Sequence, residues 1–476
     1  MGSTTTVGVV VLDYDGGDLT LRCVESALGT DWPADALRIV VVDNGSRHPV
    51  AERLRPDMER VTVLEAGTNR GFAGGCNLGI RALGPVDHVA LLNNDATVDP
   101  GWLAPLVGAL EADPSVGAAC PKILFEGSFL EIAVTSPTGV PGLGDRRALG
   151  VAVSGALLDG VDARRSLQLV SGFWGMEHPP RGGEPFQWTD GHALVRVPVP
   201  PGGPRPECLL RLSATEARPV VLASGDERAE HTVGPEPAWY PAPLGGEPFD
   251  VVNNAGSVLL DGGYGADRGY LERDEGQYDR IEEVFAWCGA AVLLSRRYLE
   301  DVGLLEERFF LYYEDFDLSW RGRARGWRHL YVPGPPVRHL HSASTVEGSR
   351  LHHHYSERNR LLTLARNAPG RMAVEAAAHH LLVTASYARR DLLAPVMHRR
   401  PPSWETVRRR SRSFGSFIGA LPPVLRERRD LRRRRRVDDG ELLVWSTAPE
   451  TRPPDGRQAV PRRSPGPPGR PRAPRK

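Results

Sequence analysis

Short apolar runs alternate with a segment of helical periodicity over the first part of the chain. Four runs rich in β-branched and aliphatic residues lie at Val7–Leu12, Arg38–Val42, Val61–Leu64 and His88–Leu92. Between the first two, Leu19–Leu28 repeats apolar residues at helical spacing. A continuous apolar run is typical of a strand that is buried on both faces of a sheet. Strands that alternate with helices over short connections predict an α/β fold with a mostly parallel sheet and right-handed crossovers.

The pattern changes between about residues 126 and 248, where short alternating runs replace helical periodicity. These runs are Glu131–Val134, Gly150–Val153, Leu167–Val170, Ala193–Val197, Cys208–Leu212 and Val220–Leu222. Clusters of glycine and proline separate them, which favours an antiparallel β-sandwich inserted into the α/β domain. A sandwich of this size needs large core residues, so two of Trp174, Trp188 and Trp239 are expected inside. An exposed one could stack on a sugar ring, and the insert could bind glycan or brace a dimer.

Strand and helix patterns return after about residue 249. Phe285–Leu294 predicts a buried strand, and His329–Val332 predicts a short strand that ends in a proline-rich turn. Beyond them, Tyr355–Ala365 has the pattern of an amphipathic helix, and Ala373–Leu393 is a second helical segment interrupted by polar residues. Residues from about Ala448 are mostly proline, arginine and glycine, which predicts disorder.

Charge and cysteine content limit the class of protein. The chain has 476 residues, with 59 basic and 59 acidic side chains, so the whole molecule is not a general polyanion binder. Its five cysteines are far apart and without CxxC spacing, which favours buried thiols in a reducing compartment. Met1–Leu12 lacks a charged leader, and no stretch of about eighteen apolar residues occurs, so we expect a cytoplasmic protein without a signal peptide or transmembrane helix.

Arginine is concentrated toward the C-terminal end. Arg408–Arg410 and Arg432–Arg436 flank the apolar segment Phe414–Ile418. This pattern could lie on anionic lipid at a membrane surface, or it could be a solvated basic helix, and the sequence leaves both open. Nucleic-acid binding would rest on the charge of this region alone and is not expected.

Polar side chains follow three of the predicted strands at the point where each strand ends. Asp43–Ser46 follows the second strand, Asn69 comes after the third, and Asn93–Asp95 follows the fourth. Ligands of open α/β sheets bind beyond the carboxyl ends of the strands. We therefore expect Asp43, Asn69 and Asp95 to converge on one ligand site.

The glycine-rich stretch Gly67–Gly75 leads into a predicted helix, Asn77–Leu83. It follows the third strand rather than the first and lacks GxGxxG spacing, so a nicotinamide cofactor is not indicated. We expect its glycines to let the backbone approach a ligand closely at a helix start.

Three carboxylates lie among aromatic residues in Phe309–Arg321, namely Glu314, Asp315 and Asp317. A carboxylate held against aromatic side chains is partly desolvated, which raises its pKa toward the range of a general base. The same residues also fit a helix N-terminus, where acidic side chains accept hydrogen bonds from free amides. Asp317 is expected to pair with Arg321 or a nearby amide and to have a structural role.

Six elements, taken in order along the chain, resemble the motifs of the family 2 glycosyltransferases. They are Asp43–Ser46, Asn69–Gly75, Asn93–Asp95, Gly289–Ala291, Tyr313–Leu318 and His339 with Ser344. In particular, the chain resembles bacterial rhamnosyltransferase-like and galactofuranosyltransferase-like members, which have a GT-A fold. The resemblance covers roughly residues 6–125 and 249–368, and it includes neither the insert nor the arginine-rich tail.

The resemblance and the changes of sequence pattern together divide the chain into five parts. Residues 1–125 would be the nucleotide-sugar-binding half of a GT-A domain, and residues 249–368 its acceptor-binding and catalytic half. Residues 126–248 would be an accessory β-sandwich between the halves. Residues 369–447 would form a helical, basic C-terminal region, and residues 448–476 a disordered tail.

The resemblance also implies roles for single residues. Contacts to the nucleotide sugar are implied for Asp43, Asn69, Gly71, Asn94, Asp95 and Gly289. Asp43 would accept hydrogen bonds from the base, although Asp-Asn-Gly is equally a turn sequence. Asn69 would contact the base or ribose. Asn93 stands where the family has the first acidic residue of its DxD element.

Metal and catalytic residues are implied in the same way. Asp95 and His339 would bind a divalent cation, and both Mn²⁺ and Mg²⁺ suit a mixture of imidazole, carboxylate and phosphate ligands. His341, two positions later on a strand-like segment, would point to the opposite face. Asp315 matches the general base, and Glu314 would assist it or fix its geometry.

The function implied by the resemblance is an inverting, metal-dependent glycosyltransferase. It would move a sugar from a nucleoside-diphosphate-sugar donor to a saccharide or lipid-linked saccharide acceptor in bacterial envelope or polysaccharide assembly. Its place would be the cytoplasm, or the inner face of the plasma membrane as a peripheral protein, and it could form an oligomer. A non-catalytic carbohydrate-binding protein with a relict transferase domain remains the alternative, which Asn93 favours and the presence of Glu314, Asp315 and His339 disfavours.

Overall fold

The computed structural model describes residues 5–54, 58, 60–142, 145–177, 184–200, 202–341, 349–397 and 401–447. Two predictions fall elsewhere. Ser344, the last residue of the His339 motif, and the predicted disordered tail 448–476 lie outside the described residues.

A ten-stranded sheet forms the centre of the α/β body. Four of its strands are parallel, in the order β4 (His88–Asn93), β1 (Val7–Asp13), β2 (Leu37–Asp43) and β3 (Val61–Glu65). β20 (Ala291–Ser295) pairs antiparallel with β4 and with β6 (Val116–Phe125), and β21 (Arg328–His339) runs parallel to β6. The short strands β5 (Ala96–Val98), β16 (Val252–Asn254) and β19 (Glu282–Glu283) pair with β6 or β21.

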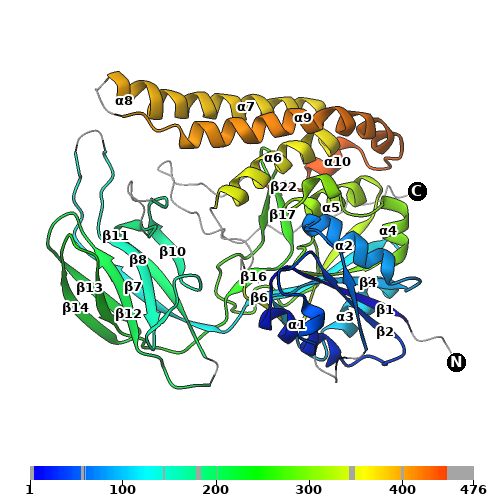
Figure 1. Ribbon diagram of the computed structural model, residues 1–476, viewed down its shortest axis with the longest axis horizontal. Helices are drawn as coiled ribbons and strands as arrows, with labels where there is room; N and C mark the ends of the chain where they lie inside the picture. Colours follow the sequence, from blue (N-terminus) through cyan, green and yellow to red (C-terminus); the bar gives the residue numbers. More distant parts are fainter. Residues whose placement is uncertain are drawn as a thin grey trace, which may run out of the picture.

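Helices cover both faces of this sheet (Figure 1). α1 (Asp18–Leu28) and α3 (Leu103–Ala112) share one core with Val9 and Val11 of β1, whereas Val10 faces the opposite core. That second core is covered by α2 (Gly71–Ala82), α4 (Arg296–Val302) and α5 (Glu314–Ala324). Successive side chains of a strand point to opposite faces, so a continuous apolar run fills both cores. The predicted parallel-rich α/β fold is confirmed.

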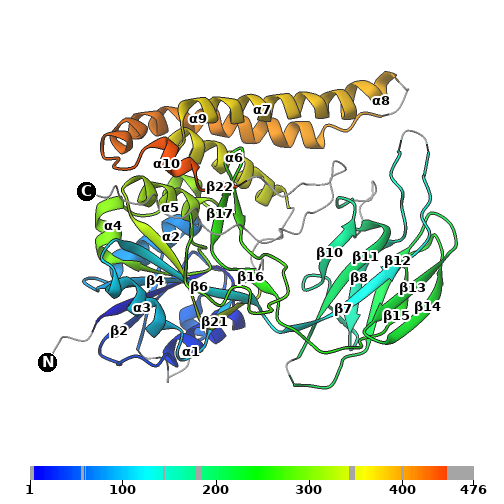
Figure 2. The same cartoon turned by 180° about the vertical axis from the view of Figure 1, so that it is seen from behind.

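Residues 128–242 form a separate nine-stranded sheet, in which every pair of neighbouring strands is antiparallel. Its strands are β7 (Ser128–Thr135), β8 (Ala152–Leu158), β9 (Val161–Asp162), β10 (Gln168–Phe173), β11 (Gln187–Val199), β12 (Cys208–Ser213), β13 (Arg218–Ser224), β14 (Glu227–Val233) and β15 (Ala238–Ala242). The long strand β11 pairs with β8 near one end and with β7 along the other, so the sheet curves around one apolar core. Trp174 lies buried, whereas Trp239 is 39% exposed. Figure 2 shows this sheet beside the α/β body.

The C-terminal region is a layer of helices over α5. It consists of α6 (Arg350–Asn367), α7 (Gly370–Ala388), α8 (Ala394–Met397), α9 (Glu405–Arg433) and α10 (Asp439–Leu443). A three-stranded sheet of β17 (Ser257–Leu260), β18 (Tyr264–Asp267) and β22 (Ser446–Thr447) lies against it. No helix in the described part of the chain is long and apolar enough to cross a membrane.

Three predicted elements differ from the structure. The predicted strand Phe285–Leu294 begins only at Ala291, because the residues before it turn toward α5 and bury their side chains there. The predicted turn after Val332 is instead an irregular stretch inside the single strand β21, where prolines interrupt the ladder between Val332 and Val337. The predicted helix Asn77–Leu83 begins at Gly71.

The glycines of α2 provide close packing. A Cβ on Gly75 would collide with the side chain of Leu12, and a Cβ on Gly79 with that of Val10, both in β1. Their absence lets the helix lie close to the sheet. Gly75, the last residue of the glycine-rich stretch, therefore has a packing role, and the approach of the stretch to a ligand stays a prediction.

The apolar segment Phe414–Ile418 is not a free surface patch. Phe417 is 5% exposed and packs with the helical core, and Phe414 stacks on the ring of His380 from α7. Ile418 alone of the large residues in this segment is exposed, at 48%. This segment therefore cannot present the lipid-facing patch that its sequence suggested.

Candidate active site

Asp95 and His339 lie side by side although 244 positions separate them in the chain. β5 pairs antiparallel with the end of β21, which places Ala96 opposite His339. The His339 Nε2 atom is 3.0 Å from Asp95 Oδ1, and both side chains are buried. The structure thus brings together the two residues predicted to bind a metal.

Asn253 orients the imidazole of His339. Its Oδ1 atom is 3.0 Å from His339 Nδ1, and because an amide oxygen only accepts, Nδ1 carries a proton. In the neutral ring, Nε2 then directs its lone pair at the Asp95 carboxylate. Two facing acceptors need a proton or a cation between them, so this donor set fits a divalent cation. No sequence pattern distinguished Asn253, which comes from the short strand β16.

Two protein ligands suit a metal site that substrate completes. Within the described ranges, no group of three or more His, Cys, Asp or Glu side chains is arranged to hold a metal ion. Mg²⁺ is commonly held by one or two carboxylates, with substrate phosphates and water in the remaining positions. Asp95 and His339 fit that kind of site better than a closed site made only of protein ligands.

A continuous series of contacts joins this pair to Asp315. The Gly289 amide donates to Asp315 Oδ2 at 2.9 Å, and the next carbonyl, that of Ala290, accepts from the Asn93 amide at 2.9 Å. The Asn93 side chain is in turn 3.4 Å from His339 Nε2. The loop before β20 therefore connects the predicted general base with the predicted metal ligands.

Burial is the main influence on the Asp315 carboxyl and raises its pKa to about 6. Hydrogen bonds from the amides of Gly289 and Phe316 oppose this change, whereas the nearby charge of Asp267 adds to it. A carboxyl with a pKa near 6 is mostly ionised at neutral pH and is more basic than a solvated aspartate. These are suitable properties for a general base.

Glu314 is 5% exposed, and its Oε2 atom has no hydrogen-bond partner among the described residues. Burial, followed by the charge of Asp315, raises its pKa well above the ordinary value. Two adjacent buried carboxyls do not both ionise readily. Glu314 is therefore the harder of the two carboxyls to ionise, and Asp315 is the one that more readily carries the charge.

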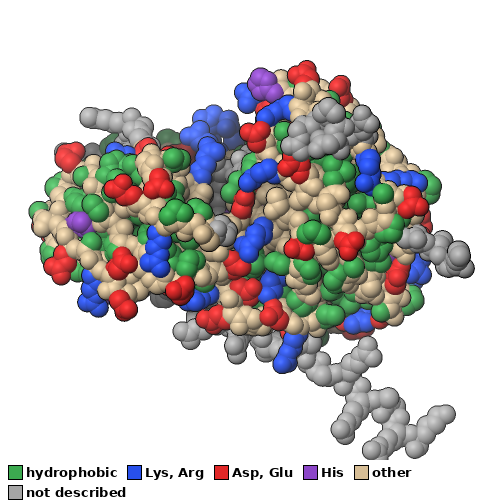
Figure 3. All heavy atoms as spheres, turned by 90° about the horizontal axis from the view of Figure 1, so that it is seen from below, with side chains coloured by type: hydrophobic (Ala, Val, Ile, Leu, Met, Phe, Trp, Pro, Cys, Tyr) green, Lys and Arg blue, Asp and Glu red, His purple; other side chains and the backbone are tan. Residues whose placement is uncertain are grey.

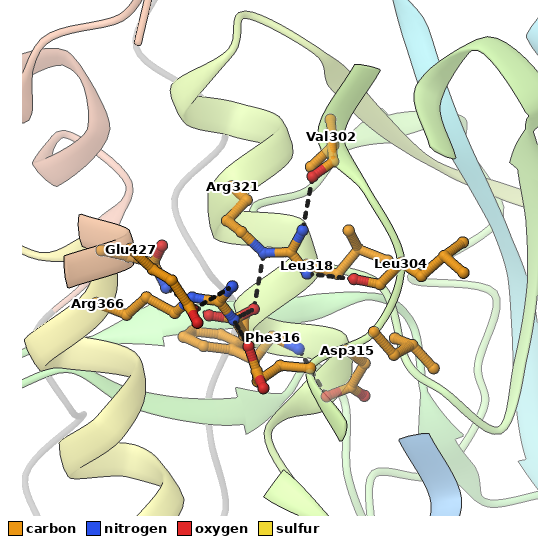
Figure 4. A network of polar contacts seen from close by, with 12 residues as sticks. Val302, Leu304, Asp315, Phe316, Leu318, Arg321, Arg366 and Glu427 are labelled. Carbon is orange, nitrogen blue, oxygen red and sulfur yellow. Dashed lines mark hydrogen bonds and ion pairs between the residues drawn. The ribbon is translucent and has the colours of Figure 1, made fainter. Parts of the chain in front are cut away.

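Asp317 has the structural role that the sequence suggested. It accepts from Arg321 at 2.8 Å, from Arg366 at 3.0 Å and from Asn367 at 2.7 Å, and it is fully buried. Arg321 also donates to the carbonyls of Val302 and Leu304, as Figure 4 shows. This network fixes α5 against α6 and engages both oxygens of the fully buried Asp317 with cationic or amide donors.

The predicted nucleotide end of the site is organised by turns. Asp43 is 4% exposed and accepts from the amides of Gly45, Ser46 and Val50, at 2.8–3.2 Å. Asn44 bridges to the Asn69 side chain at 3.1 Å, which holds the loops after β2 and β3 together. Asp43 and Asn69 are thus both near the carboxyl ends of these strands, with Asp43 engaged in its own turn.

Asp13 was not identified from the sequence, although it ends β1 as Asp43 ends the adjacent β2. It is buried and accepts hydrogen bonds from Thr20, from Ser46 at 2.9 Å and from Asn94 at 3.4 Å. The side chain of Asn94 is thereby directed toward the end of β1, where it also donates to Thr20 at 3.0 Å. The rule used for the other strand ends applies to Asp13 as well and could have found it.

The loop before α5 has an unusual backbone. Phe310, Tyr312 and Tyr313 have φ angles of 63°, 68° and 72°, in the left-handed region that residues with a Cβ seldom adopt. The Phe310 carbonyl accepts from the Phe72 amide at 2.6 Å, and a Cβ on Gly71 would collide with that carbonyl. Gly71 therefore lets the loop that carries the candidate base approach the nucleotide half.

His341 does not point away from His339, as strand alternation predicted. β21 ends at His339, and His341 has a φ of 61°, so the alternation of a strand no longer applies. The two imidazole rings are 5.7 Å apart, and Asn253 Nδ2 is 3.3 Å from His341 Nδ1. His341 therefore borders the candidate metal site.

Comparison with known proteins gives a family for part of the chain. Residues 8–146 match the family described as Glycosyl transferase family 2. The chain carries a family 2 glycosyltransferase domain. The match contains Asp43, Asn69 and Asp95, whereas Asp315 and His339 lie beyond it and join the family 2 domain through the central sheet.

Curated relatives resemble short stretches of the chain. The chain is 38% identical over 79 residues to an N-acetylglucosaminyl-diphospho-decaprenol L-rhamnosyltransferase of Mycobacterium tuberculosis. These aligned residues make up 16% of this chain and 26% of the relative. Over 92 residues it is 37% identical to a pre-mycofactocin glycosyltransferase of the same organism, 18% of each protein. The chain thus spans about a quarter or less of the length of these relatives. The resemblance to rhamnosyltransferase-like family members is confirmed at the level of the family 2 domain.

Two solved structures are similar to the chain at a low level. One is GalNAc-T7 with UDP, GalNAc and Mn²⁺, at 13% identity and a TM-score of 0.42, covering 88% of this chain and 57% of that one. The other is the mannosyltransferase PcManGT from Pyrobaculum calidifontis with GDP-Man and Mn²⁺, at 13% identity and a TM-score of 0.39, covering 88% of each chain.

Proposed function

We propose that this protein transfers a sugar from a nucleoside-diphosphate-sugar donor to a hydroxyl group of a saccharide or lipid-linked saccharide. The observation that carries the proposal is the series of contacts from Asp315 through Gly289, Ala290 and Asn93 to His339. It joins a carboxylate of raised pKa to a buried carboxylate–imidazole pair. The family 2 domain supports the class of reaction.

The donor would lie along the carboxyl ends of β1 to β4. Asn44 and Asn69 hold the loops there, and Asp43 retains capacity on Oδ2 for one further hydrogen bond from a base. Asp95 and His339 would hold a divalent cation, Mn²⁺ or Mg²⁺, which when bound neutralises charge on the two phosphates.

Asp315 would act on the acceptor. Its carboxylate takes the proton of the acceptor hydroxyl, whose oxygen forms a bond to the anomeric carbon. The bond from that carbon to the diphosphate oxygen breaks, and the nucleoside diphosphate leaves with the electron pair. One displacement inverts the anomeric configuration, and the proton remains on Asp315. Glu314 lies beside it, and because burial and the charge of Asp315 raise the pKa of Glu314, Asp315 is the carboxyl that holds the negative charge before the transfer.

Asp315→Asn tests the assignment of the base in the full chain. A thermal-shift screen of nucleotide sugars with Mn²⁺ first identifies the donor, since a bound ligand stabilises the fold by mass action. The variant is then expected to lose about 10²–10⁴-fold in transfer rate while its donor-induced shift is retained. Asp226→Asn, in an exposed turn of the insert, is the matched control. Transfer at the wild-type rate by Asp315→Asn would reject Asp315 as the base.

The same assay separates the enzyme from a carbohydrate-binding protein. Donor affinity that depends on Mn²⁺ is expected of a transferase and not of a relict domain. We also propose a cytoplasmic location and a role in bacterial envelope or polysaccharide assembly, because one relative is named for a lipid-diphospho-sugar acceptor. Loss of envelope polysaccharide on gene deletion, restored by the wild type and not by Asp315→Asn, would test that role.

A further inference from the structure

Exposed large apolar side chains are concentrated on the α7–α9 hairpin, defined here as residues 370–433. Of the eighteen large hydrophobic side chains that are exposed in the described residues, nine belong to this hairpin, which is about an eighth of the chain. They are Val374, Leu381, Leu382, Leu393, Val396, Met397, Trp404, Ile418 and Leu425. Single exposed apolar residues are ordinary on protein surfaces, but a cluster of this size marks an interaction surface.

On α7 and α8 these side chains form one stripe. Val374, Leu382 and Val396 are 68%, 70% and 62% exposed, and their positions recur at helical spacing along one side. The opposite side of α7 packs against neighbouring helices, where Ala376 and His380 are buried. α7 is therefore apolar on both sides, and its outer stripe is not needed for the internal core.

The stripe continues to the tip of the hairpin. Met397, at the end of α8, is 80% exposed, and Trp404, just before α9, is 61% exposed. Figure 1 shows α7 and α9 side by side as the outermost layer, with α6 between them and the body and α8 at the far end. Tryptophan is enriched where an apolar surface meets the headgroups of a membrane.

The same hairpin is strongly basic on its outside. Between residues 370 and 433, nine arginines and only three carboxylates are exposed in the described ranges. The arginines are Arg371, Arg389, Arg390, Arg408, Arg412, Arg426, Arg429, Arg432 and Arg433, and the carboxylates are Glu375, Glu405 and Asp430. The chain as a whole has no net charge, so the remainder is acidic on balance. Figure 3 shows the face opposite the hairpin, where acidic and basic side chains are mixed.

We propose that the outer face of the α7–α9 hairpin binds the surface of an anionic lipid bilayer. The apolar stripe and Trp404 would enter the boundary between headgroups and acyl chains, and the surrounding arginines would lie among anionic headgroups. A second copy of this chain fits the face less well, because pairing it with itself would bring the arginines of both copies together. The surface differs from the segment Phe414–Ile418, whose aromatic residues are packed inside.

The test is sedimentation of the full chain with phosphatidylcholine vesicles that contain or lack phosphatidylglycerol. Wild type is expected to pellet with the phosphatidylglycerol vesicles and to be released by salt, since screening weakens contacts with headgroups. Leu382→Glu with Val396→Glu removes the apolar contact, and Arg408→Glu with Arg412→Glu reverses the charge. Each pair of substitutions is expected to weaken the apparent affinity at least about tenfold. For the arginine pair the reason is that each basic residue near an anionic surface contributes about 1 kcal/mol. For the apolar pair the reason is the lost burial of the stripe at the headgroup boundary.

Matched controls lie on the inserted sheet. Val161 is 69% exposed on β9, and Arg228 is exposed on β14, so Val161→Glu and Arg228→Glu introduce the same changes elsewhere. Both are expected to pellet like wild type. Wild type that remains in the supernatant, or hairpin variants that pellet as well as the controls, would overturn the proposal. So would a hairpin variant that changes only the oligomeric mass, because the face would then bind a second copy.

This inference is independent of the proposed transfer reaction. Because Leu382, Val396, Arg408 and Arg412 are exposed on the outer helices whereas Asp95 and His339 are buried, the variants are expected to retain transfer to a water-soluble acceptor. Vesicle binding without any transfer activity would count against the proposed function alone. Transfer activity without vesicle binding would count against the hairpin alone.

Discussion

The side-chain amide of Asn359 in α6 donates a hydrogen bond of 2.8 Å to the carbonyl of Tyr312, in the loop that carries the candidate base. The same nitrogen is 2.8 Å from the carbonyls of Phe309 and Leu311, and Asn359 is fully buried. Left-handed residues such as Tyr312 cost free energy that the surrounding structure must supply. Asn359 therefore stabilises the backbone that positions Asp315.

Asn359→Asp tests this relationship with little change in volume. A carboxylate would face three carbonyl oxygens without a donor, so we expect a loss of about 1–3 kcal/mol of unfolding free energy and a slower transfer rate. Thr363→Val, one turn later on α6, is the control, because the Thr363 hydroxyl is buried and has no hydrogen-bond partner among the described residues. Unfolding in urea measures the first effect and initial rates the second. An Asn359→Asp variant as stable and active as Thr363→Val would contradict the role given to Asn359.

Gly71 and Gly67 together test whether the loop before α5 must contact the start of α2 closely. Their φ angles are 71° and 73°, but a Cβ on Gly71 would collide with Phe310, whereas one on Gly67 would have no neighbour within 4 Å. Gly67→Ala is expected to lower the free energy of unfolding by about 1–2 kcal/mol, which is the penalty for a residue with a Cβ in the left-handed region. Gly71→Ala should cost clearly more and also lower the transfer rate, because the loop before α5 must move. Thermal denaturation and initial rates of the two variants decide this, and equal effects would show that the contact with Phe310 is unimportant.

The pH dependence of transfer should follow Asp315. With its pKa raised to about 6 by burial, the base form is lost as the pH falls below 6, and kcat/KM should drop about tenfold per pH unit there. The observed value belongs to the coupled pair of Asp315 and Glu314 rather than to either alone. Initial rates between pH 4.5 and about 8, with enzyme stability checked at each pH, measure the profile. A rate that stays flat down to pH 4.5 would contradict a base of raised pKa.

Ionisation of Asp315, which should increase the transfer rate as the pH rises, should at the same time lower the free energy of unfolding. The fold raises the pKa of Asp315 from 3.8 to about 6, so its protonated form is the one that the folded state favours. Ionisation above pH 6 then costs up to about 3 kcal/mol, and this cost disappears as the pH falls toward 4. Asp315→Asn is therefore expected to raise the melting temperature at pH 7 relative to wild type and not at pH 4. A lower melting temperature for this variant at pH 7 would mean that the hydrogen bonds to Gly289 and Phe316 outweigh the burial of charge.

Removing His339 tests the candidate metal site. His339→Ala should weaken Mn²⁺-dependent binding of a nucleoside diphosphate at least about tenfold, because even lost supporting contacts around metals typically cost 10–100-fold. His341→Ala is the nearest control, since its ring lies 5.7 Å from that of His339 and is of the same chemical type. Calorimetry with and without Mn²⁺ separates the metal-dependent part of binding. Equal effects of the two variants would place the ligand at His341 or at both rings.

The strand runs, their alternation with helices and the polar residues at strand ends were readable from the sequence, because a buried strand must be apolar throughout. Four of the six short runs of the insert lie within observed strands, whereas Gly150–Val153 and Leu167–Val170 begin before β8 and β10. The carboxylates of Phe309–Arg321 also stood out, because acidic residues seldom have so many aromatic neighbours. Such patterns reflect whether consecutive residues are buried or exposed, which is a local property of the chain.

Contacts between residues far apart in the chain produced no pattern that could be identified in the sequence. The pairing of β5 with the end of β21 places Asp95 beside His339, and Asn253, Asp267 and Asn359 enter the site from elements with no distinctive pattern. The same holds for the hairpin, where the sequence indicated Phe414–Ile418 and the packing of α9 on α6 and α7 buried its aromatic rings. The sequence by itself determined which segments are buried strands or helices and which side chains can do chemistry. Only the tertiary structure decided which of those side chains meet and which apolar faces remain exposed, because both depend on packing between segments far apart in the chain.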